Sequence, residues 1–140
     1  MQWSRRVSVC AGVVATIVLG AGAEAQATVP PQDVGWLYTV GGGGKVYFDA
    51  DLAGFPSEEK ITVCDEKTDG RGVAAGLWGT TPGSTTETTF LYPPIKDPSN
   101  NNECVSYHAN YFADGFKVGI HIWEYWGDNT ANDVWAYGVA

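Results

Sequence analysis

The stretch Lys60–Gly72 constrains the fold of this chain more than any other part of it. It reads as a short strand that carries Cys64, then a polar turn, then an apolar strand that begins at Val73. Apolar residues alternate with small or polar ones from Ile61 onward, which is the period-two pattern of a half-buried strand. The turn contains Asp69-Gly70, a strong hairpin signal because glycine tolerates positive φ. The sequence therefore predicts a central hairpin whose cysteine can tie it to the rest of the fold.

The N-terminal segment has the layout of a secretory signal peptide. A pair of arginines precedes an apolar run from Val7 to Leu19, and two overlapping small-x-small cleavage sites follow, ending at Ala25 and Ala27. The alternative, a membrane anchor, needs about 18 to 20 continuous apolar residues, more than this run contains. We therefore expect residues 1–27 to be removed and residues 28–140 to form one secreted, extracellular domain.

The charge of the secreted part limits its partners. The whole chain has a formal net charge of −8 at pH 7. Removal of the signal peptide takes away two basic residues and one acidic residue, which leaves a net charge of about −9. Nucleic acid and anionic lipid headgroups would repel such a domain. We therefore expect neither nucleic acid nor a membrane surface as a partner, and the oligomeric state stays open.

Two cysteines, Cys64 and Cys104, remain after signal removal. An even number of cysteines in an oxidising compartment favours one disulfide. That bond would close a loop of about 40 residues and stabilise the fold by roughly 4 kcal/mol. Two separate buried thiols are the alternative. No Cys-x-x-Cys or His-x-x-x-His spacing accompanies the pair, so we expect no metal site and no cofactor.

Short apolar and aromatic segments, separated by Gly, Pro and Asn, run through the rest of the chain. They predict strands at 36–40, 45–50, 60–64, 73–79, 86–92, 104–109, 116–123 and 134–139. The segment Ile95–Cys104 is the longest expected loop, and the glycines at 41–44 are expected to connect the first two strands. About eight strands without a convincing helix predict an all-β fold, a small antiparallel sandwich or barrel.

The organising stretch also resembles a pattern found in many small exported proteins of actinomycetes. The pattern is apolar-x-Val-Cys-Asp-x-x-x-Asp-Gly-x-Gly, which here spans Ile61–Gly72. In those proteins a second cysteine follows, and a glycine later leads into an apolar strand; Cys104 and Gly115–Ile120 match this arrangement. The resemblance covers about half of the mature chain and implies export, a disulfide and β structure. It carries over no catalytic residue, and this chain is more aromatic toward its C-terminus.

A cluster of aromatic residues near the C-terminus is the first candidate for a binding site. It consists of Trp123, Tyr125, Trp126, Trp135 and Tyr137. If the rings on the two neighbouring strands share a face, they form a flat platform of the kind that stacks on sugar rings. Acidic and amide side chains of the same hairpin would line its rim: Glu124, Asp128, Asn129 and Asn132. The alternative is that these rings supply buried area for a small domain.

Other candidate sites fit their chemistry less well. Acidic residues at 65, 66 and 69 suggest a calcium loop, but Lys67 and Gly76 stand where such a loop needs ligands. His108 and His121 lack a serine or cysteine nucleophile in a recognisable motif. Two carboxylates that meet in space are enough for glycoside cleavage, but a domain this small rarely builds a deep cleft. We therefore expect a protein without catalytic activity.

These observations predict a secreted binding domain. The first hypothesis is that the aromatic hairpin binds a carbohydrate or a cell-envelope glycan. The second is an extracellular protein-binding or hydrolase-inhibitor domain that acts through its loops, with Pro93–Glu103 as the presented segment. That loop has no bulky anchor of the Trp, Tyr or Arg type that dominates tight interfaces. A structural component of the cell envelope is the third hypothesis.

Overall fold

The computed structural model describes residues 29–98, 101 and 103–140, which form nine strands and no helix. The strands are β1 (Val34–Tyr38), β2 (Gly44–Asp49), β3 (Glu59–Asp65), β4 (Gly72–Gly79), β5 (Phe90–Leu91), β6 (Ile95–Asp97), β7 (Val105–Ala109), β8 (Lys117–Trp126) and β9 (Asn129–Val139). The signal peptide expected over 1–27 lies outside the described residues.

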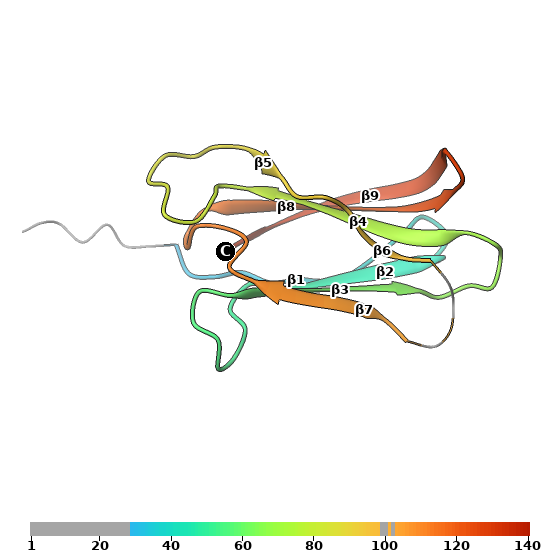
Figure 1. Ribbon diagram of the computed structural model, residues 1–140, viewed down its shortest axis with the longest axis horizontal. Helices are drawn as coiled ribbons and strands as arrows, with labels where there is room; N and C mark the ends of the chain where they lie inside the picture. The colour runs from blue at the N-terminus through green and yellow to red at the C-terminus, as the bar shows by residue number, and fades with distance from the viewer. Residues whose placement is uncertain (1–28, 99–100, 102) are drawn as a thin grey trace, which may run out of the picture.

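The strands form two antiparallel sheets that pack face to face (Figure 1). One sheet has the order β1-β2-β3-β7, and the other has the order β5-β4-β8-β9, with β6 pairing with β4 beside β5. The prediction of an all-β antiparallel sandwich is confirmed.

The core lies between the sheets and follows from the alternation of side chains along each strand. Its main members come from four strands: Val46 and Phe48, Ile61 and Val63, Val73, Ala75 and Leu77, and Val118, Ile120 and Ile122. Phe112, from the loop after β7, is fully buried and lies 6.5 Å from Phe48 between ring centres. The intervening residues therefore form the outer faces of the sheets.

The prediction that residues 60–64 and 73–79 form a hairpin is wrong. Strand β3 pairs with β2 and β7, whereas β4 pairs with β5, β6 and β8, so residues 66–71 carry the chain from one sheet to the other. The Asp-Gly signal does form a local turn, because Asp69 Oδ1 accepts the N–H of Arg71 and Gly70 has φ of 78°. A connection of this length does not impose hairpin register on its flanks.

The predicted disulfide between Cys64 and Cys104 is present. Cys64 lies near the end of β3, and Cys104 immediately precedes β7, its antiparallel neighbour. The bond therefore joins two adjacent strands of one sheet, at the end where the chain continues from β3 toward the other sheet.

Three boundaries differ from the sequence-based expectation. Strand β9 begins at Asn129, because only Gly127 and Asp128 separate it from β8. The expected loop Ile95–Cys104 begins with β6, and positions 99, 100 and 102 lie outside the described residues. The strand expected at 86–92 is only two residues long. Upstream of it, Ser and Thr side chains bond to nearby backbone groups and compete with sheet pairing.

Candidate aromatic binding face

Aromatic rings cover glycines on the outer face of the β4–β8–β9 sheet. Gly119 of β8 pairs with Trp78 on one side and Tyr137 on the other. A side chain at Gly119 would collide with the indole of Trp78, so this ring lies directly over the β8 backbone. The ring of Trp123 lies beside Gly76 in a similar way, 3.4 Å from the place a Cβ would occupy. Part of the aromatic content therefore fills the space that glycines leave.

Four of the five predicted rings share this outer face: Trp123, Tyr125, Trp135 and Tyr137. Residues two apart on a strand point to the same side of the sheet. Trp135 is 51% exposed and Tyr137 is 55% exposed, whereas Trp123 and Tyr125 are half-buried. The most exposed rings therefore lie on the edge strand β9.

The rings are inclined to one another and do not form a flat platform. Trp78 lies 4.5 Å from Trp135 at an interplanar angle of 67°, and 6.1 Å from Tyr137 at 88°. The imidazole of His121 stacks on Trp135 at 3.8 Å and 10°, and lies 4.7 Å from Trp123. The surface is therefore ridged, with Trp135 and His121 forming one parallel pair across two strands.

Two depressions lie at the ends of this ridged surface. The first has a volume of about 290 Å³ and is lined by His121, Trp123, Thr130, Ala131 and Asp133. The second has a volume of about 160 Å³ and is lined by Trp78, Gly79, Glu87, Thr88, Thr89, Lys117, Gly119 and Tyr137. Each combines aromatic surface with hydrogen-bonding groups, and Trp135 lies between them along β9.

A β-bulge in β9 changes which residues of this strand face outward on its two sides. Asn132 and Asp133 together lie opposite Trp123, where a regular strand would place one residue. Asn132 has a left-handed φ of 57°, and its side chain turns inward and donates to Glu124 Oε2 at 2.8 Å. Asp133 turns outward, where its Oδ2 lies 3.2 Å from Nε2 of His121. Asp133, two residues before Trp135, therefore lies on the same face as Trp135 and Tyr137.

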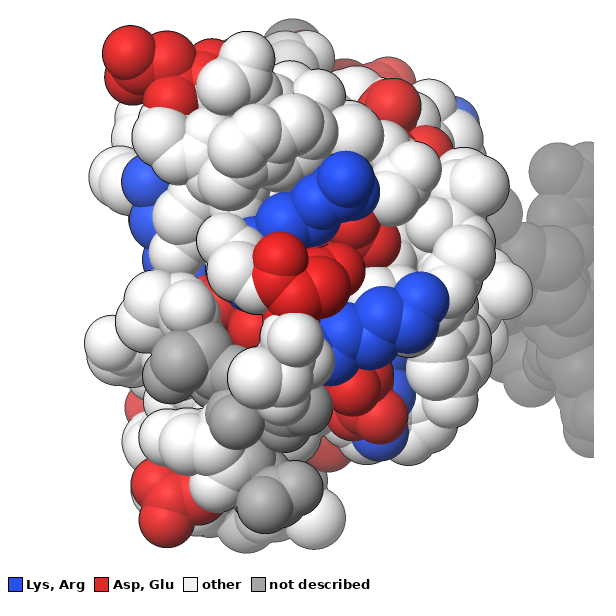
Figure 2. All heavy atoms as spheres, turned by 90° about the vertical axis from the view of Figure 1, so that its right-hand side faces the viewer, with Lys and Arg blue, Asp and Glu red and all other residues white. Residues whose placement is uncertain are grey.

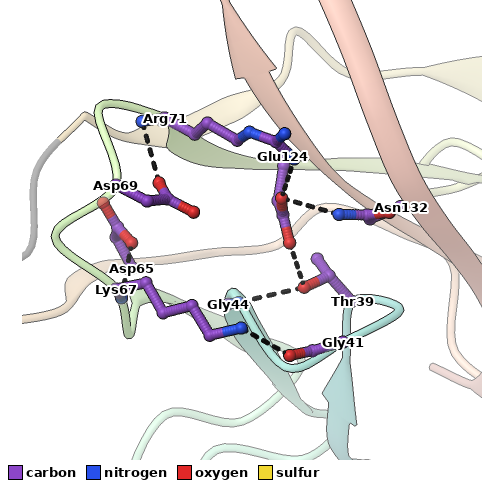
Figure 3. A network of polar contacts seen from close by, with 9 residues as sticks. All are labelled: Thr39, Gly41, Gly44, Asp65, Lys67, Asp69, Arg71, Glu124 and Asn132. Atoms are coloured by element: carbon purple, nitrogen blue, oxygen red, sulfur yellow. Dashed lines mark hydrogen bonds and ion pairs between the residues drawn. The ribbon is translucent and has the colours of Figure 1, made fainter.

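The fifth predicted ring, Trp126, lies elsewhere, at the tip of β8 under the guanidinium of Arg71, 4.4 Å from the ring centre. Glu124 is not at the rim of the aromatic face, as the sequence suggested, but is buried between the sheets (Figure 3). It accepts from Thr39 Oγ1 at 2.9 Å, and from Arg71 Nη1 and Asn132 Nδ2 at 2.8 Å each. Although burial acts in the opposite direction, these hydrogen bonds lower the pKa of Glu124.

Asp65 lies at the same end of the sandwich, where basic and acidic side chains are intermixed on the surface (Figure 2). Its Oδ1 accepts the N–H of Lys67, and its own N–H donates to Asp97 Oδ2. Its Oδ2 is buried without a hydrogen-bond partner among the described residues, and burial raises the pKa of Asp65. No group of three or more His, Cys, Asp and Glu in the described part of the chain is arranged to hold a metal ion.

Both histidines are paired with carboxylates. His108 Nδ1 lies 2.7 Å from Glu58 Oε2, and its ring packs 5.1 Å from Phe55 on the opposite sheet from the aromatic face. His121 pairs with Asp133 as described above. Of the two, only His121 belongs to the candidate site.

Fold and site together define a disulfide-bonded β-sandwich with an aromatic outer face. No family model, no curated protein and no solved structure matches this chain. Over residues 29–98, 101 and 103–140, no helix is long and apolar enough to cross a membrane. The disulfide indicates that the chain folds in an oxidising compartment.

Sequence reasoning missed three members of the face: Trp78, His121 and Asp133. A signal for Trp78 existed in Gly119, because a glycine within a predicted strand leaves room for a bulky neighbour. The alternation along β8 also placed His121 on the same side as Trp123. A signal for Asp133 existed as well, because it lies two residues before Trp135 and four before Tyr137 in the same strand.

Proposed function

We propose that the protein is a secreted, non-catalytic binding domain that holds a carbohydrate or cell-envelope glycan on the outer face of β4, β8 and β9. The observation that carries this proposal is the pair of depressions, one at each end of the ridged aromatic surface. Sugars present apolar C–H faces and hydroxyl edges, so their sites combine ring surface with a few placed polar groups. Two such depressions on one face suit a chain of sugars better than a single sugar.

The exposure of Trp135 and Tyr137 also supports a binding role. Trp78 and Trp123 lie over or beside glycines, so packing accounts for their positions. Trp135 and Tyr137 are more than half exposed on the edge strand, and packing within the domain does not account for their exposure. Contiguous exposed aromatic surface is typical of interaction sites.

A depletion assay tests the proposal. The purified protein is mixed with insoluble cellulose, chitin, xylan or peptidoglycan, and the protein left in the supernatant is measured. We expect selective depletion by one polymer, and its loss in the double variant Trp135→Ala/Tyr137→Ala. The matched control is Trp36→Ala, which removes a similarly exposed indole (45%) from the opposite sheet.

The outcomes separate the hypotheses. Depletion that survives the double variant, or that Trp36→Ala abolishes equally, overturns the assignment to this face. If no polymer depletes the protein, the glycan-binding proposal is overturned. A protease panel is then the next assay, because it tests the protein-binding alternative.

Export is part of the same proposal. The support is the arginine pair, the apolar run and the small-x-small sites of the first 27 residues, together with the disulfide. We expect the protein from culture medium to begin at Gln26 or Thr28. Its intact mass distinguishes these two sites from each other and from an uncleaved chain.

A further inference from the structure

Asp133 is the polar group most firmly positioned on the aromatic face. Its Oδ2 lies 3.2 Å from Nε2 of His121 and 3.2 Å from Nε1 of Trp135. The two rings that carry these nitrogens are themselves stacked at 3.8 Å. Two ring nitrogens that meet one oxygen, one of them the N–H donor of Trp135, restrict the orientation of the carboxylate. The second oxygen, Oδ1, therefore keeps acceptor capacity in a set orientation.

The hydrogen bonds also keep this carboxylate charged. The bond from His121, followed by that from Trp135, lowers the pKa of Asp133. An ionised carboxylate only accepts hydrogen bonds, with about four lone-pair positions over its two oxygens. Its side chain is 59% exposed, so the positions that His121 and Trp135 leave free are open to a ligand. A ligand at Asp133 must therefore bring hydrogen-bond donors.

The surroundings of Asp133 disfavour a negatively charged ligand. The residues that line its depression include no lysine or arginine. Lys117 lies in the other depression, above the ring of Tyr137 and in company with Glu87. The chain as a whole has a net charge of −8, which adds long-range repulsion toward polyanions.

We propose that the ligand of this face is an uncharged, hydroxyl-rich glycan and that Asp133 selects it by accepting hydrogen bonds from sugar hydroxyls. This inference rests on the glycan-binding function proposed above and narrows its ligand class. Glycans that carry carboxylates or sulfates are excluded by the same carboxylate. His121 and Trp135 then have two roles: they contribute ring surface and they orient the acceptor.

The test compares variants and ligands in one assay. Asp133→Asn keeps the shape of the side chain but removes its charge, and it places an amide N–H₂ where one acceptor oxygen stood. We expect roughly tenfold weaker binding to the neutral polymer, the loss of about one hydrogen bond to a charged group. The control is Asp51→Asn, which removes an exposed acid that follows β2 of the opposite sheet and should leave binding unchanged.

The ligand panel sets neutral polymers, namely cellulose, chitin and mannan, against anionic ones, namely polygalacturonate and alginate. We expect binding within the neutral group only, both at low salt and at 0.5 M NaCl, a concentration chosen because it screens long-range repulsion. Selective binding of an anionic polymer overturns the inference, as does neutral-polymer binding that Asp133→Asn leaves intact. Both results leave glycan binding standing. Absence of binding to every polymer instead overturns the proposed function.

Discussion

Two glutamates are buried at opposite ends of the sandwich, and they differ in their hydrogen-bond partners and in the direction of their pKa shifts. Glu124 accepts hydrogen bonds from three side chains, one of them the cation Arg71, and its pKa is lowered. Glu59, at the start of β3, accepts the N–H of Tyr111 at 2.7 Å and has no cationic partner among the described residues. Burial raises the pKa of Glu59 to about 7.

The two ends of the domain differ in how many polar contacts stabilise them. The Glu124 end contains the disulfide, an ion pair and the β-bulge next to Asp133. The Glu59 end carries a carboxylate whose charged form is poorly compensated. We therefore expect the Glu124 carboxylate to stay charged near neutrality and the Glu59 end to weaken as pH rises.

Removal of the disulfide should have the largest effect. The bond joins residues 40 apart in the chain, and in the chain-entropy model its loss costs about 4 kcal/mol. Urea denaturation of the native protein and of Cys64→Ala/Cys104→Ala measures this difference. A loss well below 1 kcal/mol would mean that the Glu124 end is held by its polar network alone.

Removal of Glu124 should come next. Glu124→Ala leaves Thr39, Asn132 and Arg71 without their acceptor and should cost about 3 kcal/mol in the free energy of unfolding. Glu66→Ala is the control, because Glu66 makes an exposed ion pair with Lys45 at 2.7 Å, a type that contributes less than about 1 kcal/mol. Equal losses in the two variants would show that the buried network adds nothing beyond a surface pair.

This contrast also marks the limit of what the sequence could predict. The alternation of apolar residues correctly indicated most strands, because each residue of a strand meets one face of its own sheet. The hairpin connection at 41–44 was predictable because it depends on local conformation. The disulfide was predictable because only two cysteines remain after removal of the signal peptide. The sheet that β4 joins was not predictable, because its partners β5, β6 and β8 are distant in sequence and the turn at 66–71 suits either outcome.

The site was partly predictable for the same reason. Trp123, Tyr125, Trp135 and Tyr137 share a face because they follow strand alternation on one hairpin. Trp126 departs from that face because it follows an outward-facing residue, so alternation places it on the other side. The inward turn of Glu124 and the outward turn of Asp133 also follow alternation, because Glu124 lies two residues after Ile122 and Asp133 two residues before Trp135. The bulge itself had no such local signal.

The Glu59 end should respond to pH in a defined direction. The folded-state pKa of Glu59 is about 7 and its ordinary value is 4.5, so the folded protein binds this proton more tightly than the unfolded chain does. Stability from this group is therefore complete below pH 4.5, falls as pH rises toward 7 and stays reduced above it. Glu59→Gln removes the charge and should stabilise the protein at pH 8 but not at pH 4.

The size of that gain follows from the pKa difference. The difference corresponds to about 3 kcal/mol, and the weaker hydrogen bonds that an amide accepts reduce the net gain to about 2 kcal/mol at pH 8. Urea midpoints at pH 4, 6 and 8 measure it, with the adjacent Glu58→Gln as control. A gain that is the same at all three pH values would contradict titration of Glu59 as its cause.

Substitutions of Asn132 should have the smallest effect on stability, and they distinguish two contributions to the stability of the bulge. Asn132→Gly keeps the left-handed backbone but loses the hydrogen bond to Glu124, and should cost about 1 kcal/mol. Asn132→Ala loses the same bond and also places a Cβ at a φ of 57°, which should cost about 1 kcal/mol more. Urea denaturation orders the two variants. If they are equally stable, backbone strain is absent and the bond to Glu124 alone maintains the bulge. A glycine variant as stable as the native protein would show that the hydrogen bond from Asn132 to Glu124 adds nothing to the stability of the bulge.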